Sequence, residues 1–144
     1  MKAAAIWIRL AKCYGLVLQR VRTLPDRSGL TLPQFDALAQ LLRYPKGMTA
    51  GELSHALLVT AGNVTGIVAR LRSRGLVVRE TRPDDRRTAA LRLTPAGRRL
   101  ALAAVLRHER HLENVFSKMP GPERTRLRRS LDRLRGSLEL RRNA

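Results

Sequence analysis

The residues between positions 60 and 74 have types and an order that suit contact with nucleic acid. A helix over 61–74 would place Val64, Ile67, Val68 and Leu71 on one apolar face. The other side starts with small or uncharged residues and ends with arginines: Gly62, Asn63, Thr65, Gly66, Ala69, Arg70, Arg72, Ser73 and Arg74. Asn and Thr can hydrogen-bond base edges in the major groove, and glycines allow close approach. This order predicts a helix that reads bases with its first turns and anchors phosphates with Arg70, Arg72 and Arg74.

A second basic group follows at positions 81–88, a polar stretch with turn chemistry between two short β-type runs at 76–78 and 89–93. Arg82, Arg86 and Arg87 would project from the tip of this hairpin, where guanidinium groups fit the negative potential of a narrow minor groove. We expect Asp85 to pair with Arg87 and stiffen the tip, which leaves Arg86 to enter the groove. A plain turn aspartate is the alternative for Asp85, and a solvated helix face is the alternative for the arginines at 70–74.

Local signals define the elements that must position these residues. Thr49 and Glu52 have capping-box spacing before a short helix, and Thr60 can cap the next, so the two make a helix-turn-helix that ends near Gly75. Thr31 and Gln34 repeat the box before an upstream helix. Three further helices are predicted: one with a stripe from Ile6 to Leu24, one opened by Thr94-Pro95, and one carrying Leu127, Leu131, Leu134 and Leu138.

The predicted fold is mainly α with a small β-hairpin wing (α+β), in one domain over residues 1–144. A winged helix-turn-helix occupies residues 31–97, flanked by helices at 3–24, 95–118 and 122–141. A winged helix is self-contained, so the apolar stripes of the flanking helices need cover. A two-fold homodimer provides it, because a leucine stripe can be buried against its own copy.

Composition limits the function classes. The net charge of +18 favours polyanionic partners, although a genome-wide arginine bias would produce the same excess. Cys13 is the only cysteine, which excludes an internal disulfide and suits a reducing compartment. Arg9 and Lys12 interrupt the apolar opening, so we expect a cytoplasmic protein with no membrane partner.

No nucleophile–base pair, phosphate loop or metal-ligand spacing stands out, which argues against an enzyme and predicts no cofactor. The basic last helix, residues 124–142, leaves an architectural or RNA-binding protein without operator specificity as the alternative.

Several motifs together resemble the MarR family of bacterial transcriptional regulators. They are Thr-Ala-Gly-Glu-Leu at 49–53, Val-Thr-Ala-Gly-Asn-Val-Thr at 59–65, Leu71 to Val77, Asp-Arg-Arg at 85–87, and Leu-Arg-Leu-Thr-Pro-Ala-Gly at 91–97. Residues 29–35 resemble the entry to that family's second helix. The resemblance covers nearly the whole chain.

The resemblance implies a homodimeric repressor whose first and last two helices interlock and whose two winged units read a palindromic operator. It implies that a small molecule relieves repression by binding between the dimer platform and the winged unit. Carried over by position, major-groove contacts fall on Thr60, Ala61, Gly62, Asn63, Thr65, Gly66 and Arg70, and the wing role on Asp85, Arg86 and Arg87. Many relatives have a longer side chain where this chain has Gly66.

Three weaker signals concern sensing. Cys13 resembles the first-helix cysteine of the family's peroxide sensors, but it lies on the apolar stripe and is interpreted as a buried structural residue. His108 and His111 are similar to features of zinc-sensing relatives, yet two histidines make an incomplete zinc set, so no metal is predicted. The candidate lining of a pocket for a small apolar or aromatic effector is Trp7, Tyr14, Phe35 and Tyr44, each of which could instead be core.

Overall fold

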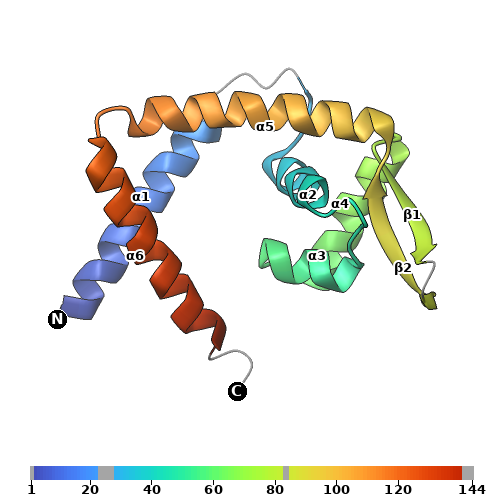
Figure 1. The fold of residues 1–144 in the computed structure, drawn as a ribbon, viewed down its shortest axis with the longest axis horizontal. Helices are drawn as coiled ribbons and strands as arrows, with labels where there is room; N and C mark the ends of the chain where they lie inside the picture. Colours follow the sequence, from blue (N-terminus) through green and yellow to red (C-terminus); the bar gives the residue numbers. More distant parts are fainter. Residues whose placement is uncertain (1, 23–27, 83–84, 141–144) are drawn as a thin grey trace. The chain divides into compact units, whose positions relative to one another are not determined.

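A computed structural model describes residues 2–22, 28–82 and 85–140; of these, the side chains of 22, 82, 85–88 and 140 are not described. The described residues form α1 (Lys2–Arg22), α2 (Leu32–Arg43), α3 (Ala50–Leu57), α4 (Ala61–Ser73), β1 (Val77–Arg82), β2 (Asp85–Leu93), α5 (Pro95–Phe116) and α6 (Gly121–Leu140). The chain divides into two compact units, residues 21–109 and residues 1–20 with 110–144. The mainly helical fold with one β-hairpin confirms the predicted fold class (Figure 1).

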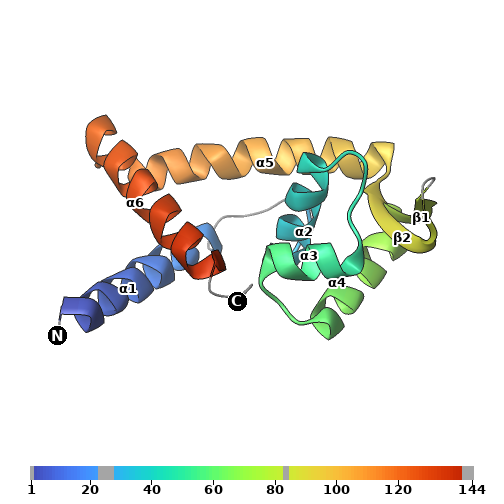
Figure 2. The same cartoon turned by 60° about the horizontal axis from the view of Figure 1, so that its bottom comes forward.

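The core of the winged unit, residues 21–109, lies among α2, α3, α4 and the hairpin. Figures 1 and 2 show these three helices packed beside one another, with the hairpin next to α4. Leu38, Leu53, Val64 and Leu71 are fully buried at the centre of this cluster. Burying one such side chain contributes about 1.5–3 kcal/mol. The apolar stripe predicted on the helix over 61–74 therefore fixes α4 in the unit and turns its other side outward.

Threonine caps start α2, α3 and α4, as predicted. Thr31 and Thr49 form complete capping boxes with Gln34 and Glu52. In the second box, the Thr49 N–H donates to Glu52 Oε2 at 2.6 Å and the Glu52 N–H donates to Thr49 Oγ1 at 3.0 Å. Each cap satisfies backbone donors that the first turn of a helix leaves unpaired, a gain of about 1 kcal/mol.

The turn between α3 and α4 depends on an unusual backbone conformation. Leu58 has a φ of 54°, in the left-handed region, and its N–H donates to the carbonyl of His55. The hydroxyl of Ser54 donates to the carbonyl of Val59 at 2.6 Å and closes the turn from the other side. The result is a short connection that sets the direction in which α4 begins.

The hairpin is longer than the sequence predicted. The strands extend to Arg82 and begin again at Asp85, whereas we expected a turn from 81 to 88. Val77 pairs with Leu93 at the base, Thr81 pairs with Ala89, and the register shifts before Arg82 pairs with Asp85. The outer strand residues are polar, so no alternation of apolar residues marks them in the sequence. Met48 adds an isolated antiparallel bridge to Leu91, which ties the hairpin to the loop after α2.

Thr94 and Gly97 join the hairpin to α5. The Thr94 hydroxyl donates to the Gly75 carbonyl at 2.7 Å and accepts the Gly97 N–H at 2.9 Å, while the Thr94 N–H donates to the Leu76 carbonyl at 3.1 Å. A Cβ at Gly97 would lie 2.8 Å from the Leu76 carbonyl carbon, which is too close for any side chain. The Thr and Gly of the Leu-Thr-x-x-Gly sequence therefore allow the start of α5 to pack directly against the backbone of Gly75 and Leu76.

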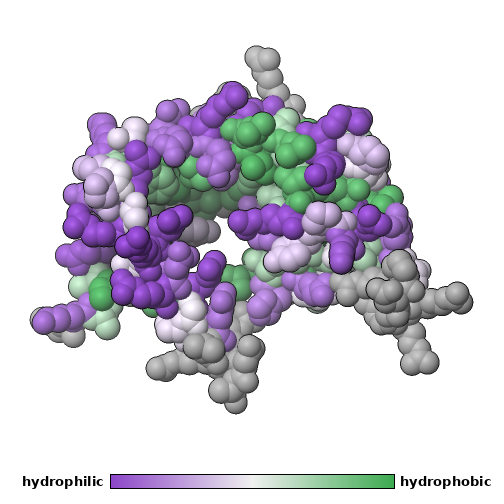
Figure 3. Space-filling model, in the orientation of Figure 1, coloured by the Kyte–Doolittle hydropathy of each residue, from purple (hydrophilic) through white to green (hydrophobic). Residues whose placement is uncertain are grey.

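The other unit, formed by α1, the end of α5, and α6, exposes much of its apolar surface. On α1, Ile6 is 64% exposed and Trp7 is 67% exposed. The α6 stripe of Leu127, Leu131, Leu134 and Leu138 is at least 40% exposed throughout. Figure 3 shows further hydrophobic surface along α5 within a mostly hydrophilic face. No helix in the described part of the chain is long and apolar enough to cross a membrane.

Candidate nucleic-acid interface

Helix α4 presents an open and mostly uncharged surface over its first two turns. Ala61, Gly62, Asn63, Thr65 and Gly66 are all exposed. A Cβ added at Gly62 or Gly66 would meet nothing within 4 Å. Each glycine costs a helix about 0.5–1 kcal/mol relative to alanine, and packing within the winged unit does not require either one. Because Gly62 and Gly66 have no side chains, a molecule outside the unit can approach the backbone of α4 closely at these two positions.

The polar groups of this surface remain able to bind. Thr60 is the N-cap, and its hydroxyl oxygen accepts the Asn63 N–H at 3.4 Å. Thr65 donates its hydroxyl hydrogen to the Ala61 carbonyl at 3.1 Å, which leaves its oxygen as an acceptor. The Asn63 amide is exposed and offers both donors and an acceptor. The start of α4 therefore has the hydrogen-bonding groups that base edges can pair with.

The three arginines at the end of α4 differ in what they contact. Arg70 and Arg72 are exposed, and among the described residues their guanidinium groups have no hydrogen-bond or ion-pair partner. Arg74 instead donates to two backbone carbonyls, those of Ser28 and Gly29. The sequence grouped the three together, but within the described part of the chain only Arg70 and Arg72 have guanidinium groups without a partner.

The wing brings further charge to the unit. Arg92 on β2 and Glu80 on β1 form an exposed ion pair at 3.0 Å across the hairpin, which contributes at most about 1 kcal/mol. The side chains of Arg82, Asp85, Arg86 and Arg87 lie outside the described residues, as does the expected pair between Asp85 and Arg87. The backbone places Arg82 opposite Asp85 at the outer end of the hairpin.

Known proteins share this arrangement. The sequence model of the MarR family matches residues 28–88, the segment that contains α2 to α4 and most of the hairpin. A MarR family transcriptional regulator from Silicibacter pomeroyi is 34% identical, with 95% of each chain covered and a TM-score of 0.77. The chain belongs to the MarR family. MarR proteins are DNA-binding transcriptional regulators and not enzymes.

Two other similar proteins extend the comparison over most of the chain. The uncharacterized HTH-type transcriptional regulator YsmB of Bacillus subtilis (strain 168) is 28% identical over 87% of this chain and 85% of its own length. The crystal structure of CouR from Rhodococcus jostii RHA1, bound to p-coumaroyl-CoA, is 26% identical and covers 90% of each chain with a TM-score of 0.81.

The candidate effector-pocket residues of this MarR protein are distributed over two helices. Trp7 and Tyr14 lie on α1 and are each 67% exposed, while Tyr44 caps the end of α2 and is also exposed. Phe35 on α2 packs its ring against His108 on α5, with ring centroids 4.7 Å apart and planes tilted by 48°. Of the four, only Phe35 makes a described aromatic contact.

The same contact gives His108 a packing partner. Next to Phe35, burial raises the pKa of the Asp36 carboxyl above its ordinary value, and the charge of His108 lowers it in part.

His111 is half-buried one turn further along α5. Among the described residues there is no group of three His, Cys, Asp or Glu side chains that could hold a metal ion.

The interpretation of Cys13 as a buried residue was wrong for the single chain. Cys13 is exposed on α1, as are its neighbours Leu10 and Leu16. The three- and four-residue spacing of the stripe correctly indicated a helix with an apolar face, but the described residues leave its first part, from Ile6 to Cys13, exposed, whereas Val17 and Val21 are half-buried.

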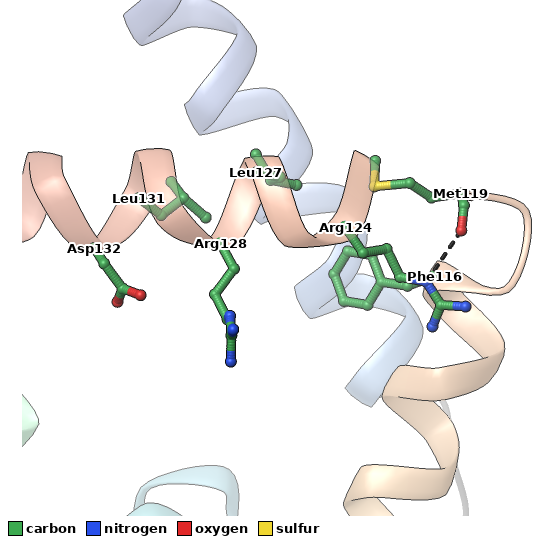
Figure 4. A pocket seen from close by; sticks show the side chains of 7 residues that line it. All are labelled: Phe116, Met119, Arg124, Leu127, Arg128, Leu131 and Asp132. Carbon is green, nitrogen blue, oxygen red and sulfur yellow. Dashed lines mark hydrogen bonds between the residues drawn. The ribbon is translucent and has the colours of Figure 1, made fainter. Parts of the chain in front are cut away.

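Sequence reasoning missed a hollow at the elbow between α5 and α6. It has a volume of about 330 Å³, and Phe116, Met119, Leu127 and Leu131 form its apolar wall (Figure 4). Arg124 and Arg128 border it, and Arg124 is held by Glu113 at 2.8 Å and by the Met119 carbonyl at 3.0 Å. Phe116 and Met119 flank a helix end, so no periodic pattern in the sequence joins them to the α6 leucines.

Proposed function

We propose that the protein is a homodimeric repressor that occupies a palindromic operator and is released by a small-molecule effector. The observation that carries this proposal is the exposed apolar surface of α1 and α6, since a single chain leaves Ile6, Trp7 and four α6 leucines in water. Full burial of an exposed apolar side chain contributes about 1.5–3 kcal/mol; these side chains are 40–67% exposed, so each would contribute part of that, and together they favour a second copy. Two copies related by a two-fold axis present two winged units, which match the two halves of a palindrome.

In this proposal, residues 60–66 of each copy lie in the major groove. Base edges form hydrogen bonds with the side chains of Asn63, Thr60 and Thr65. The DNA can approach the helix closely at Ala61, Gly62 and Gly66. The open space at both glycines supports this role, because packing within the unit does not require them. Arg70 and Arg72 contact phosphates, since their guanidinium groups have no partner among the described residues.

The wing supplies the minor-groove contact. Arg86 enters the groove, flanked by Arg82, while Asp85 pairs with Arg87 and holds the tip in shape. The described ion pair between Arg92 and Glu80 supports a stiff hairpin that can carry this tip.

The effector is proposed to be a small molecule with an aromatic or apolar part. The relative CouR supports this class, since its crystal structure contains p-coumaroyl-CoA. The aromatic side chains of Trp7, Tyr14, Phe35 and Tyr44 are the candidates to contact it, and three of these four are exposed.

The test is genome-wide capture of DNA with the purified protein, followed by footprinting of the recovered sites. We expect a few palindromic sites, protected on two successive turns of one face of the duplex. Sedimentation at micromolar concentration should give the mass of a dimer, and a monomer would overturn the proposal. Aromatic carboxylates and their thioesters can then be screened as effectors. A compound that dissociates the protein from operator DNA would identify the effector class.

A second candidate, a basic architectural protein, is favoured by the outward arginines of α6. Arg126, Arg129 and Arg133 follow at three- and four-residue spacing and have no partner among the described residues. Uniform coverage of the genome in the same capture experiment would support this candidate and exclude operator reading.

A further inference from the structure

Arg74 ends α4, the proposed recognition helix, and contacts a part of the chain that is far away in sequence. Its backbone N–H donates to the Arg70 carbonyl and closes the last turn of α4. Its side chain reaches back by 45 and 46 residues, where Nη1 donates to the Gly29 carbonyl at 3.0 Å and Nη2 donates to the Ser28 carbonyl at 2.9 Å. One guanidinium therefore joins the end of α4 to the segment that leads into α2.

The receiving segment is shaped to accept this side chain. Gly29 has a φ of +64°, a conformation that favours glycine, and a Cβ there would lie 3.9 Å from Arg74 Nη2. The Leu30 N–H donates to Ser28 Oγ at 3.2 Å, and Thr31 then caps α2. The two carbonyl oxygens thus belong to an ordered turn at the start of a capped helix.

We propose that Arg74 is a positioning residue for operator reading, which holds the recognition helix in its angle against α2, and not a phosphate contact. A 13-residue helix is about 20 Å long, so a tilt of about 5° about its end moves its first residue by nearly 2 Å. Hydrogen bonds to base edges form only within a range of about 0.5 Å in donor–acceptor distance. Fixing the end of α4 is therefore a requirement for reading bases at its start.

Lysine separates the two roles, because it keeps the charge but donates from one nitrogen, and so cannot place donors at the two separate positions that Nη1 and Nη2 of the planar guanidinium occupy. A phosphate contact predicts that Arg74→Lys keeps wild-type binding. A positioning role predicts that Arg74→Lys loses about tenfold in affinity for the operator and keeps its affinity for random DNA. We expect Arg74→Ala to behave as Arg74→Lys does, with the salt dependence of operator binding unchanged.

The neighbouring Arg72→Ala is the matched control, since Arg72 is exposed on the same turn. Loss of a phosphate contact makes the negative slope of log K against log salt shallower by ~0.9 per contact and weakens specific and non-specific binding together. A purely structural role of Arg74 would lower the melting temperature while leaving the ratio of operator to random-DNA affinity at the wild-type value. That unchanged ratio, or a reduced salt slope for Arg74→Ala, would overturn the inference.

A measurement without DNA tests the inference independently of the proposed operator. Amide hydrogen exchange in the free protein should speed up at residues 30–34 and over the first turn of α4 in Arg74→Lys, and not in Arg72→Ala. Unchanged exchange at both places would refute the positioning role even if no palindromic operator exists, and an absent operator with the expected exchange would refute the proposed function alone.

Discussion

Substitution of Gly97 by alanine tests the crossing of α5 over the start of the wing. The added methyl group would lie 2.8 Å from the carbonyl carbon of Leu76 and 3.2 Å from its Cα, where ordinary contacts are 3.4–4 Å. Both groups belong to the backbone, so no side-chain rotation can relieve the overlap. The added methyl group would also overlap the carbonyl oxygen of Leu76, which accepts the Thr94 N–H, so moving this oxygen also strains the cap of α5.

The expected change in the free energy of unfolding of Gly97→Ala is the difference between two opposing contributions. Alanine normally stabilises a helix by about 0.5–1 kcal/mol relative to glycine, whereas forcing extra volume into a packed site costs about 1–3 kcal/mol, and rigid backbone on both sides places Gly97 at the upper end. A net loss of about 2 kcal/mol corresponds to a fall in melting temperature of roughly 8–16 °C for a unit of this size.

The assay is thermal and urea unfolding of wild type, Gly97→Ala and Gly66→Ala, with the melting temperature and the free energy of unfolding as readouts. Gly66 is the matched control, since it is also helical in the winged unit but has open space where the methyl group would lie. If Gly97→Ala is as stable as wild type, the close approach to Leu76 is not a constraint and the explanation of the Leu-Thr-x-x-Gly sequence is wrong.

Three further outcomes are expected. Gly66→Ala should raise the free energy of unfolding by about 0.5–1 kcal/mol yet weaken operator binding in a gel-shift titration, and an unchanged affinity would remove Gly66 from the DNA surface. Arg86→Ala should weaken operator binding about tenfold without changing the sedimentation mass, and unaltered binding would exclude the wing. Because burial raises the pKa of Asp36, the folded state binds its proton more tightly, and wild type should lose stability relative to Asp36→Asn as pH rises from about 3.8 through the raised value. Urea titrations between pH 3.5 and 7, conditions spaced about half a unit apart, measure that difference, and parallel curves would contradict the burial of this carboxyl.

The parts of the fold that the sequence predicted are those that short-range chemistry determines. Thr31, Thr49 and Thr60 each cap a helix through a residue three positions later, and Gly75 ends α4 with a φ of +66°. These contacts span a few residues, so their donors and acceptors can be identified in a linear sequence. The positions of α2, α3 and α4 followed from the same signals.

The structural features that the sequence did not predict share a different cause: they depend on contacts between distant parts of the chain or with another molecule. The outer wing strands carry polar residues on both faces, so their pairing depends on the register set at the base by Val77 and Leu93. The contacts of Arg74 depend on where the fold brings Ser28, and its neighbours in the sequence contain no trace of them. Cys13 lies on a true apolar stripe, but periodicity reports only that a face is apolar, and its cover must come from elsewhere.

The glycines of α4 also bear on how such a regulator can diverge. At Gly62 and Gly66 a new side chain would meet open space, and nearly any residue other than proline would make the helix more stable. Substitutions that change which bases are read therefore carry no folding penalty at these two positions. A duplicated copy of this gene could acquire a different operator by single mutations, while its core of Val64, Val68 and Leu71 remained intact.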